Sequence, residues 1–194
     1  MDTGPMIASL DEIVAHLSAL GRGVVPLLQA GLSDAELAAV EVTLPFLLSS
    51  EMLALYRWRD GTAAAAGESL NTLTFFPGFY FPSLEEAVQI YHERKDSPQW
   101  RGGWFPIFAD GAGDFYIVPC ESTRKDSAGV IGFIHGEPDQ PVEYESLTTM
   151  LQTIAACYAQ GAFFVDADGY VEVDDDAHQR IANRFNPEIP EWQS

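Results

Sequence analysis

The apolar residues in the first half of the chain recur at helical spacing, and each run follows a serine that can cap a helix. Ser9, Ser33 and Ser83 each stand three residues before a glutamate, which is the spacing of a capping box. The apolar side chains after each serine fall on one face of a helix. These signals predict helices that begin at the three serines and end at about residues 20, 42 and 95.

Three further segments of the first half carry weaker signals. Pro45 can begin a helix, because its missing N–H has no partner to lose in the first turn. This helix would end at Asp60-Gly61, a pair typical of turns. The small residues 63–67 predict a surface loop, and the apolar run Leu73–Phe76 predicts a short strand.

The second half changes to short apolar runs separated by turns. Three runs predict strands, namely Phe105–Ala109, Phe115–Pro119 and Val130–His135. The first two flank the sequence Asp-Gly-Ala-Gly-Asp at 110–114, whose glycines allow the positive φ that a hairpin needs. The close spacing favours an antiparallel meander over parallel crossovers, which need a dozen or more residues.

The remaining residues alternate between helix and strand signals. Residues 146–160 predict a helix with Gly161 as its C-terminal cap, and Phe163–Val165 with Tyr170–Val173 predict a second hairpin. A last helix is expected to begin in the aspartates at 174–176, whose charge suits the helix dipole. This order predicts an α+β fold with a mainly antiparallel sheet and helices packed against it. No repeat or linker interrupts the chain, so residues 1–194 predict a single domain.

Composition adds a strongly acidic balance. The 194 residues are 47% hydrophobic, enough for one well-buried core, and their formal net charge is −19. Such a charge argues against nucleic acid and anionic membranes as partners, because phosphate binding depends on clustered Lys and Arg. It would attract a basic protein and speed the encounter with it. An acidic surface that only keeps the protein soluble explains the same charge.

The expected lack of targeting segments and the spacing of the cysteines indicate an intracellular protein. No segment reaches the roughly 18 apolar residues of a membrane span, and residues 1–20 do not read as a secretory signal. Cys120 and Cys157 form no CxxC pair, which favours two small buried hydrophobic residues over a disulfide. We therefore expect a cytoplasmic protein.

The search for catalytic motifs is negative. His16, His92, His135 and His178 show no metal-ligand spacing, and no GxSxG elbow is present. Gly111-Ala112-Gly113 leads into a strand and not a helix, which argues against a dinucleotide site. The sequence therefore predicts a protein with no cofactor and no metal that is not an enzyme.

Two acidic groups have alternative interpretations. The run 166–176 holds six carboxylates, which could form a calcium site. An EF-hand loop would need an acidic residue where Tyr170 stands and a glycine where Val171 stands. A solvated hairpin is therefore favoured over a calcium-binding loop. Asp110 and Asp114 could form an acid/base pair. Aspartates at a tight turn more often accept hydrogen bonds from backbone N–H groups.

Several motifs together resemble the SUKH superfamily of Smi/Knr-like proteins. Trp104-x-Pro106-Ile, the Asp-Gly-x-Gly-Asp turn and the following aromatic-aliphatic strand are its most specific features. Other segments fit in the family's order, with Asp60 where Asn is common: Leu44-Pro45, the helix ending at Asp60-Gly61, 83–87, 146–151 and 181–187. The resemblance spans 32–187, and residues 1–30 would be an N-terminal helical addition.

The resemblance implies an α+β fold and a non-catalytic binding function. The superfamily includes bacterial immunity proteins that neutralise a cognate toxin, often a nuclease, and yeast cell-wall assembly regulators. We therefore expect an immunity protein whose partner is a cognate, possibly basic, toxin. A regulatory or scaffold protein of the same fold is the alternative, and a toxin gene immediately upstream would separate the two.

The partner-binding surface is less sharply indicated. Residues 79–81 are consecutive aromatics, and side chains alternate along a strand, so at least one should face solvent or a partner. The residues that carry the resemblance could bind a partner, or could serve only as core and turn residues. The candidate binding residues are Asp60, Phe79, Tyr80, Phe81, Trp104, Asp110, Asp114, Asp174, Asp175 and Asp176. The expected structural turn residues are Gly61, Pro106, Gly111 and Gly113.

Overall fold

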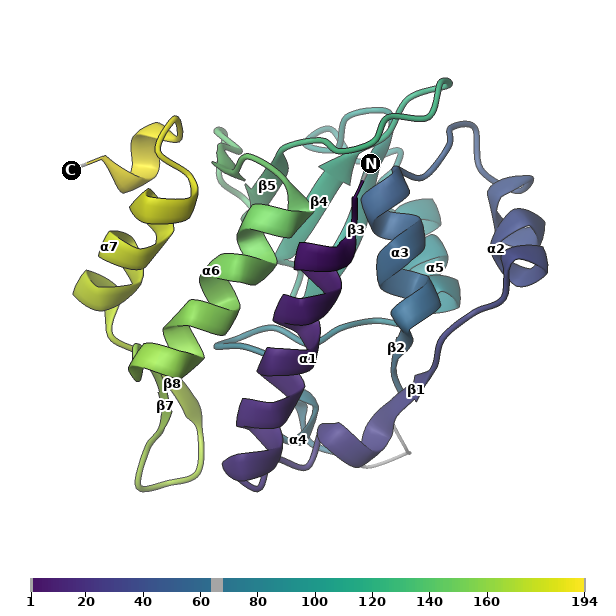
Figure 1. The fold of residues 1–194 in the computed structure, drawn as a ribbon. Helices are drawn as coiled ribbons and strands as arrows, with labels where there is room; N and C mark the ends of the chain where they lie inside the picture. The colour runs from purple at the N-terminus through teal and green to yellow at the C-terminus, as the bar shows by residue number, and fades with distance from the viewer. Residues whose placement is uncertain (1, 64–67, 194) are drawn as a thin grey trace.

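Helices and antiparallel strands form one α+β domain, as predicted from the sequence (Figure 1). The computed structural model describes residues 2–63 and 68–193. The helices are α1 (Gly4–Ala19), α2 (Asp34–Glu41), α3 (Ser50–Trp58), α4 (Leu70–Leu73), α5 (Leu84–Arg94), α6 (Leu147–Gln160) and α7 (Asp175–Phe185), with 3-10 turns η1 (Val25–Leu27) and η2 (Pro190–Trp192). The strands are β1 (Leu28–Ala30), β2 (Arg59–Thr62), β3 (Trp104–Ala109), β4 (Phe115–Pro119), β5 (Val130–Phe133), β6 (Val142–Tyr144), β7 (Phe163–Val165) and β8 (Val171–Val173).

The main sheet is an antiparallel meander in the order β3-β4-β5-β6. Its first three strands were predicted, whereas β6 was not, because β6 spans only three residues and its middle residue is Glu143. Val142 and Tyr144 pair with β5. Figure 1 shows α1, α3 and α6 in front of this sheet, with α1 and α6 side by side. Two small sheets, β1-β2 and β7-β8, complete the fold.

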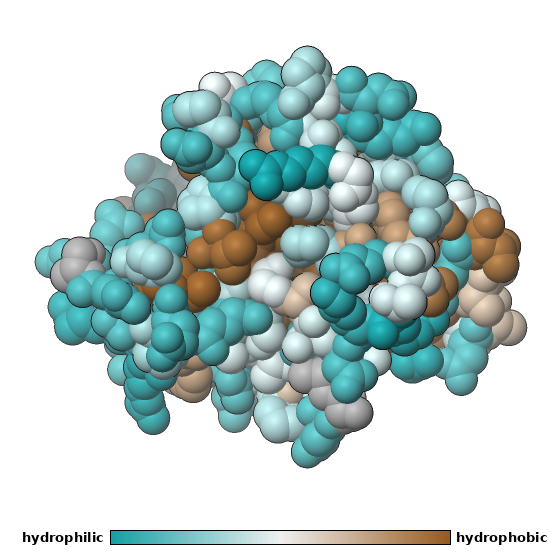
Figure 2. Space-filling view, turned by 90° about the horizontal axis from the view of Figure 1, so that it is seen from above, coloured by the Kyte–Doolittle hydropathy of each residue, from teal (hydrophilic) through white to brown (hydrophobic). Residues whose placement is uncertain are grey.

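Both faces of the main sheet are covered by apolar side chains. The larger core includes one face of the sheet and the helices α1, α3, α5 and α6. A smaller aromatic cluster lies on the other face, where Trp100 contacts Trp104, Phe115 and Phe133. The face of the molecule seen from above is mostly hydrophilic, with a hydrophobic patch near its centre and a second group of hydrophobic residues at the right edge (Figure 2).

The N-terminal helix is part of the main core and no separate appendage. Met6, Leu10, Ile13 and Leu17 of α1 are fully buried, and α1 packs along α6. The segment expected as an addition therefore contributes a complete apolar face to the domain, which follows the helical spacing seen in the sequence.

Several expected helix starts are confirmed. Ser33 and Glu36 form the predicted capping box of α2, and Ser83 caps α5 by accepting a hydrogen bond from the Glu86 N–H. Ser146 caps α6, which ends at Gly161 in the left-handed conformation. The second hairpin and the last helix also form where predicted, with Asp174 as the cap of α7.

Two expected helices of the first half form with other bounds, and one expected strand does not form. The helix predicted from Ser9 begins at Gly4, with a proline in its first turn, and the buried Ser9 hydroxyl donates to the Pro5 carbonyl within it. The helix predicted from Pro45 begins at Ser50, because Ser49 supplies a side-chain cap and Leu47 instead bridges to Glu121.

This helix also ends at Trp58, so Asp60-Gly61 lies in strand β2. The strand predicted over Leu73–Phe76 does not form. Leu73 ends the short helix α4, which Ser69 caps, and Phe76 makes an isolated bridge with Phe79. The loop expected over 63–67 falls almost entirely outside the described residues.

Candidate partner-binding cleft

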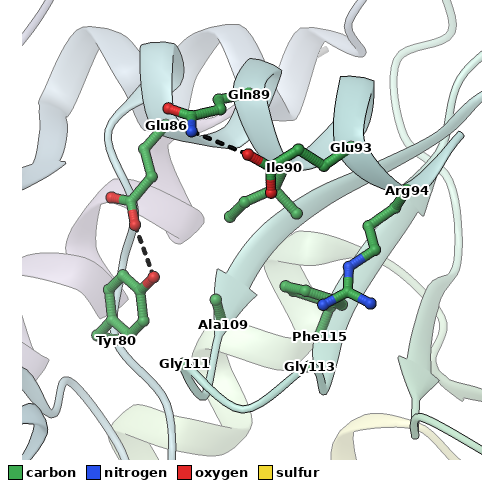
Figure 3. Close-up of a pocket in the computed structure, with 10 residues that line it drawn as sticks. All are labelled: Tyr80, Glu86, Gln89, Ile90, Glu93, Arg94, Ala109, Gly111, Gly113 and Phe115. Atoms are coloured by element: carbon green, nitrogen blue, oxygen red, sulfur yellow. Dashed lines mark hydrogen bonds between the residues drawn. The ribbon is translucent and has the colours of Figure 1, made fainter.

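Tyr80 lies at the free edge of strand β3 and faces helix α5. Its backbone N–H donates to the Ala109 carbonyl at 2.8 Å, and the Ala109 N–H donates to the Tyr80 carbonyl at 3.1 Å. Its hydroxyl donates to Glu86 Oε1 at 2.6 Å (Figure 3). The Glu86 side chain therefore does not complete the capping box that its spacing from Ser83 predicted, and accepts the hydrogen bond from Tyr80 instead.

A cleft of about 270 Å³ opens between α5 and the turn that joins β3 to β4. Figure 3 shows Glu86, Gln89, Glu93 and Arg94 along α5, opposite the turn at Gly111 and Gly113. Apolar side chains also line it, so the cleft combines a polar rim with an apolar lining. The apolar and aromatic residues that line it are Tyr80, Ile90, Ala109 and Phe115.

The charges of the cleft suit a polar or cationic group of a partner. Glu86 accepts from Tyr80, and Glu93 Oε1 accepts from Gln89 Nε2 at 2.9 Å. Burial, and secondly the neighbouring Glu86, raise the pKa of Tyr80, so its hydroxyl remains a donor at neutral pH. Arg94 lies over the Phe115 ring at 5.6 Å and makes no ion pair within residues 2–63 and 68–193. Among the described residues, the lining of the cleft holds two glutamates, one tyrosine and one arginine, and no Ser, Thr, Cys, Lys or His.

The turn beside the cleft uses its aspartates to hold the backbone. Asp110 Oδ1 accepts from the N–H groups of residues 112, 113 and 114 at 2.8–2.9 Å. Asp114 Oδ1 accepts from the His135 N–H at 2.8 Å and so ties the turn to the end of β5. Gly111 and Gly113 have positive φ. The turn interpretation of this motif is therefore confirmed, and the hydrogen bonds of Asp110 argue against an acid/base role.

Asp60 and Gly61 connect strand β2 to helix α5. Asp60 Oδ1 accepts from the Leu84 N–H at 2.8 Å, in the first turn of α5. Gly61 has a φ of 66°, and a Cβ there would lie 2.3 Å from the Pro82 backbone. Both residues have an architectural role, and only glycine fits at position 61.

Burial removes two aromatic candidates from the partner-facing residues. Phe81 is fully buried and Trp104 is 5% exposed, because Phe81 packs on Phe108 and Trp104 packs in the small aromatic cluster. Phe79 is half-buried over Tyr116 at 4.7 Å, so of the three consecutive aromatics Tyr80 alone lines the cleft. Pro106 is buried in β3, an edge strand, where its missing N–H is tolerated.

Comparison with known families agrees with this architecture. The model of the SMI1 / KNR4 family (SUKH-1) matches residues 31–153. The chain belongs to the SMI1/KNR4 family. The match includes the cleft, the Asp60-Gly61 connection and the Trp104 hairpin, and this family includes toxin-immunity proteins. No curated protein matches the chain.

The acidic candidates Asp174, Asp175 and Asp176 lie outside the part matched by the SMI1/KNR4 family and away from the cleft. Asp174 caps α7 through a hydrogen bond from the Ala177 N–H at 3.0 Å, and Asp175 and Asp176 occupy its first turn. No cluster of His, Cys, Asp and Glu in the described part of the chain could hold a metal ion. Among these residues, no helix is long and apolar enough to cross a membrane.

The SMI1/KNR4 domain also contains a buried polar group that the sequence did not indicate. Tyr144 Oη lies 3.4 Å from His178 Nε2, and Tyr116 hydrogen-bonds to Glu143. Burial lowers the pKa of His178 and raises the pKa of Glu143 and of both tyrosines. The adjoining pocket of about 90 Å³ is lined mostly by apolar and aromatic side chains. Sequence spacing could not reveal this group, because its members come from β4, β6 and α7.

Proposed function

We propose that this protein is an immunity protein that binds and neutralises a cognate protein toxin in the cytoplasm of the cell that makes it. Membership of the SMI1/KNR4 family carries this proposal, because that family includes toxin-immunity proteins. The net charge of −19 supports a basic toxin, since opposite charge steers association and adds specificity.

The proposed mechanism is stoichiometric occlusion without turnover. The cleft beside the β3–β4 turn offers carboxylates, a phenol and an apolar lining, which can hold a cationic side chain of the toxin. Burial raises the pKa of Cys157 to about 12, which keeps that thiol protonated and unreactive. An acidic protein that covers a basic nuclease site would compete with the phosphates of its substrate.

The test is co-expression with the gene immediately upstream. The toxin domain encoded there is expressed alone, with this protein, and with an unrelated protein of similar acidity. We expect growth arrest with the toxin alone, recovery with this protein only, and a one-to-one complex in size-exclusion chromatography with light scattering.

Growth arrest without recovery contradicts the proposal, because the toxin then has another antidote. A neighbouring product that is not toxic but forms a stable complex also contradicts it, and favours the regulatory or scaffold alternative.

A further inference from the structure

The β7–β8 hairpin presents two exposed aromatic side chains on one face. Phe164 and Tyr170 are 42% and 53% exposed, the only aromatics among the exposed large hydrophobic residues of the described chain. Phe164 pairs with Glu172 across the hairpin, and the Asp166 N–H donates to the Tyr170 carbonyl at 2.9 Å, which continues the pairing to Tyr170. Tyr170 is two residues before Glu172, so Phe164 and Tyr170 project from the same face. The opposite face packs into the core through Phe163 and Val171. The outer face is therefore a small sheet surface without a partner in the domain.

The hairpin is fixed to the body of the protein at both ends. At its tip, the Gly169 carbonyl accepts from Arg22 Nη1 at 2.7 Å and from Asn71 Nδ2 at 3.1 Å. At its base, Asp174 N–H donates to the Ala162 carbonyl at 2.8 Å. Figure 1 shows the hairpin extending below α6 and α7. Such preorganisation lowers the entropy that binding would cost.

The hairpin lies in an acidic stretch of the sequence, and Arg22 is the cation that contacts its tip. From residue 126 to residue 179 the chain holds eleven Asp and Glu and no Lys or Arg. Asp168, Glu172 and Asp174–Asp176 are exposed on or beside the hairpin. Aromatic anchors flanked by exposed carboxylates complement a basic surface that presents apolar side chains among its cations.

We propose that the outer face of the β7–β8 hairpin, with Phe164 and Tyr170 as anchors, is a docking surface for a basic protein. The proposal rests on the proposed function, because it names the chemistry of the partner and a second contact surface for it. The hairpin lies beyond residues 31–153, so this surface belongs to the part of the chain outside the family match.

The first test uses defined peptides and does not need the toxin. The probes are decalysine and a decapeptide in which three of the lysines are replaced by leucine, titrated against ¹⁵N-labelled protein at moderate salt. We expect amide shifts to concentrate in residues 162–176 for both peptides, with tighter binding of the leucine peptide. Shifts spread over the other acidic surfaces, or equal affinities for the two peptides, would overturn the proposal.

Paired variants separate the aromatic from the acidic contribution. Phe164→Thr with Tyr170→Thr should weaken binding of the leucine peptide at least about threefold and leave decalysine binding unchanged. The matched control, Leu20→Thr with Val42→Thr, removes two other exposed apolar side chains and should change neither. All four positions are exposed, so these variants leave the core unchanged. Equal losses of peptide affinity in the two double variants would contradict the assignment.

The toxin recovered by co-expression supplies the second test. The Phe164→Thr/Tyr170→Thr protein should bind it at least about tenfold more weakly, through faster dissociation. Unchanged toxin binding by this variant overturns the docking surface and leaves the immunity function intact. If the wild-type protein binds no toxin, the immunity proposal fails, and the peptide titration alone decides on the hairpin surface.

Discussion

The carboxylate of Glu51 on α3 binds Thr148 in the first turn of α6, accepting hydrogen bonds from both its N–H and its hydroxyl. The second carboxylate oxygen accepts from the Leu147 N–H at 3.3 Å. Glu51 is 1% exposed, and it satisfies N–H groups that a helix leaves without partners at its N-terminus. A single side chain thus joins two helices that lie far apart in the sequence.

Removal of this carboxylate should destabilise the domain. We expect Glu51→Ala to lower the free energy of unfolding by about 2–3 kcal/mol, because buried donors of α6 lose their acceptor. Urea denaturation measures the change. The control Glu121→Gln alters a surface ion pair with Lys125 and should stay within about 0.5 kcal/mol of wild type. Equal midpoints for the two variants would show that Glu51 has no such role.

The stability of a His178→Gln protein should fall as the pH rises from about 5 to 7.5. This background is chosen because burial lowers the pKa of His178, so its titration would oppose the carboxyl effect in the same range. Burial raises the pKa of Glu51, Asp60 and Glu143 in the folded state. The folded protein then holds more protons than the unfolded chain at pH values above the ordinary carboxyl range, so raising the pH favours unfolding there.

Urea unfolding across this pH range, at a salt concentration that screens surface charge, measures the slope. Glu143→Gln removes one of these groups and should make the slope shallower. A stability that increases toward pH 7.5 would contradict the assignment.

Gly61 and Gly21 form a matched pair for testing the β2–α5 connection. Their φ values are 66° and 67°, so alanine meets the same backbone strain of about 1 kcal/mol at each. Alanine at Gly61 would also place Cβ 2.3 Å from the Pro82 backbone, whereas nothing lies within 4 Å at Gly21. We expect Gly61→Ala to shift the urea midpoint clearly more than Gly21→Ala, and similar shifts would contradict the close packing.

The two thiols should react slowly in the native protein. Cys120 and Cys157 are free, as expected, and burial raises the pKa of each to about 12. Because the thiolate is the reactive form, we expect little labelling by a disulfide reagent at pH 7.5 and rapid labelling of both in denaturant. Rapid labelling of the native protein would show that the thiols are accessible.

Local signals explain which parts of the fold were predictable. Ser33, Ser83 and Ser146 cap helices through contacts within four residues, so their sequence pattern suffices. Ser9 shows the same pattern but lies inside α1, because the helix begins earlier at Gly4. The start of α3 depends on pairing between Leu47 and Glu121, which no local pattern reveals.

The candidate site was predictable only in part, for a similar reason. The turn at Asp110 and the candidate aromatic Tyr80 could be identified from the sequence. The pairing of Tyr80 with Ala109, which places Tyr80 beside this turn, could not. Glu86 was expected to complete a cap, and its turn toward Tyr80 follows from the tertiary fold. Phe81 and Trp104 were both candidates for binding, with a core role as the alternative for Trp104, and both are buried.

We propose that the protein neutralises a cognate toxin by stoichiometric binding, and a titration of toxin activity tests this proposal most directly. A fixed amount of the toxin domain is mixed with increasing amounts of this protein, and the remaining toxin activity is measured after equilibration. We predict a linear loss of activity that ends at one molecule of this protein per toxin. Complete inactivation at a small fraction of that ratio would show turnover and contradict the claim, as would activity that persists at a large excess.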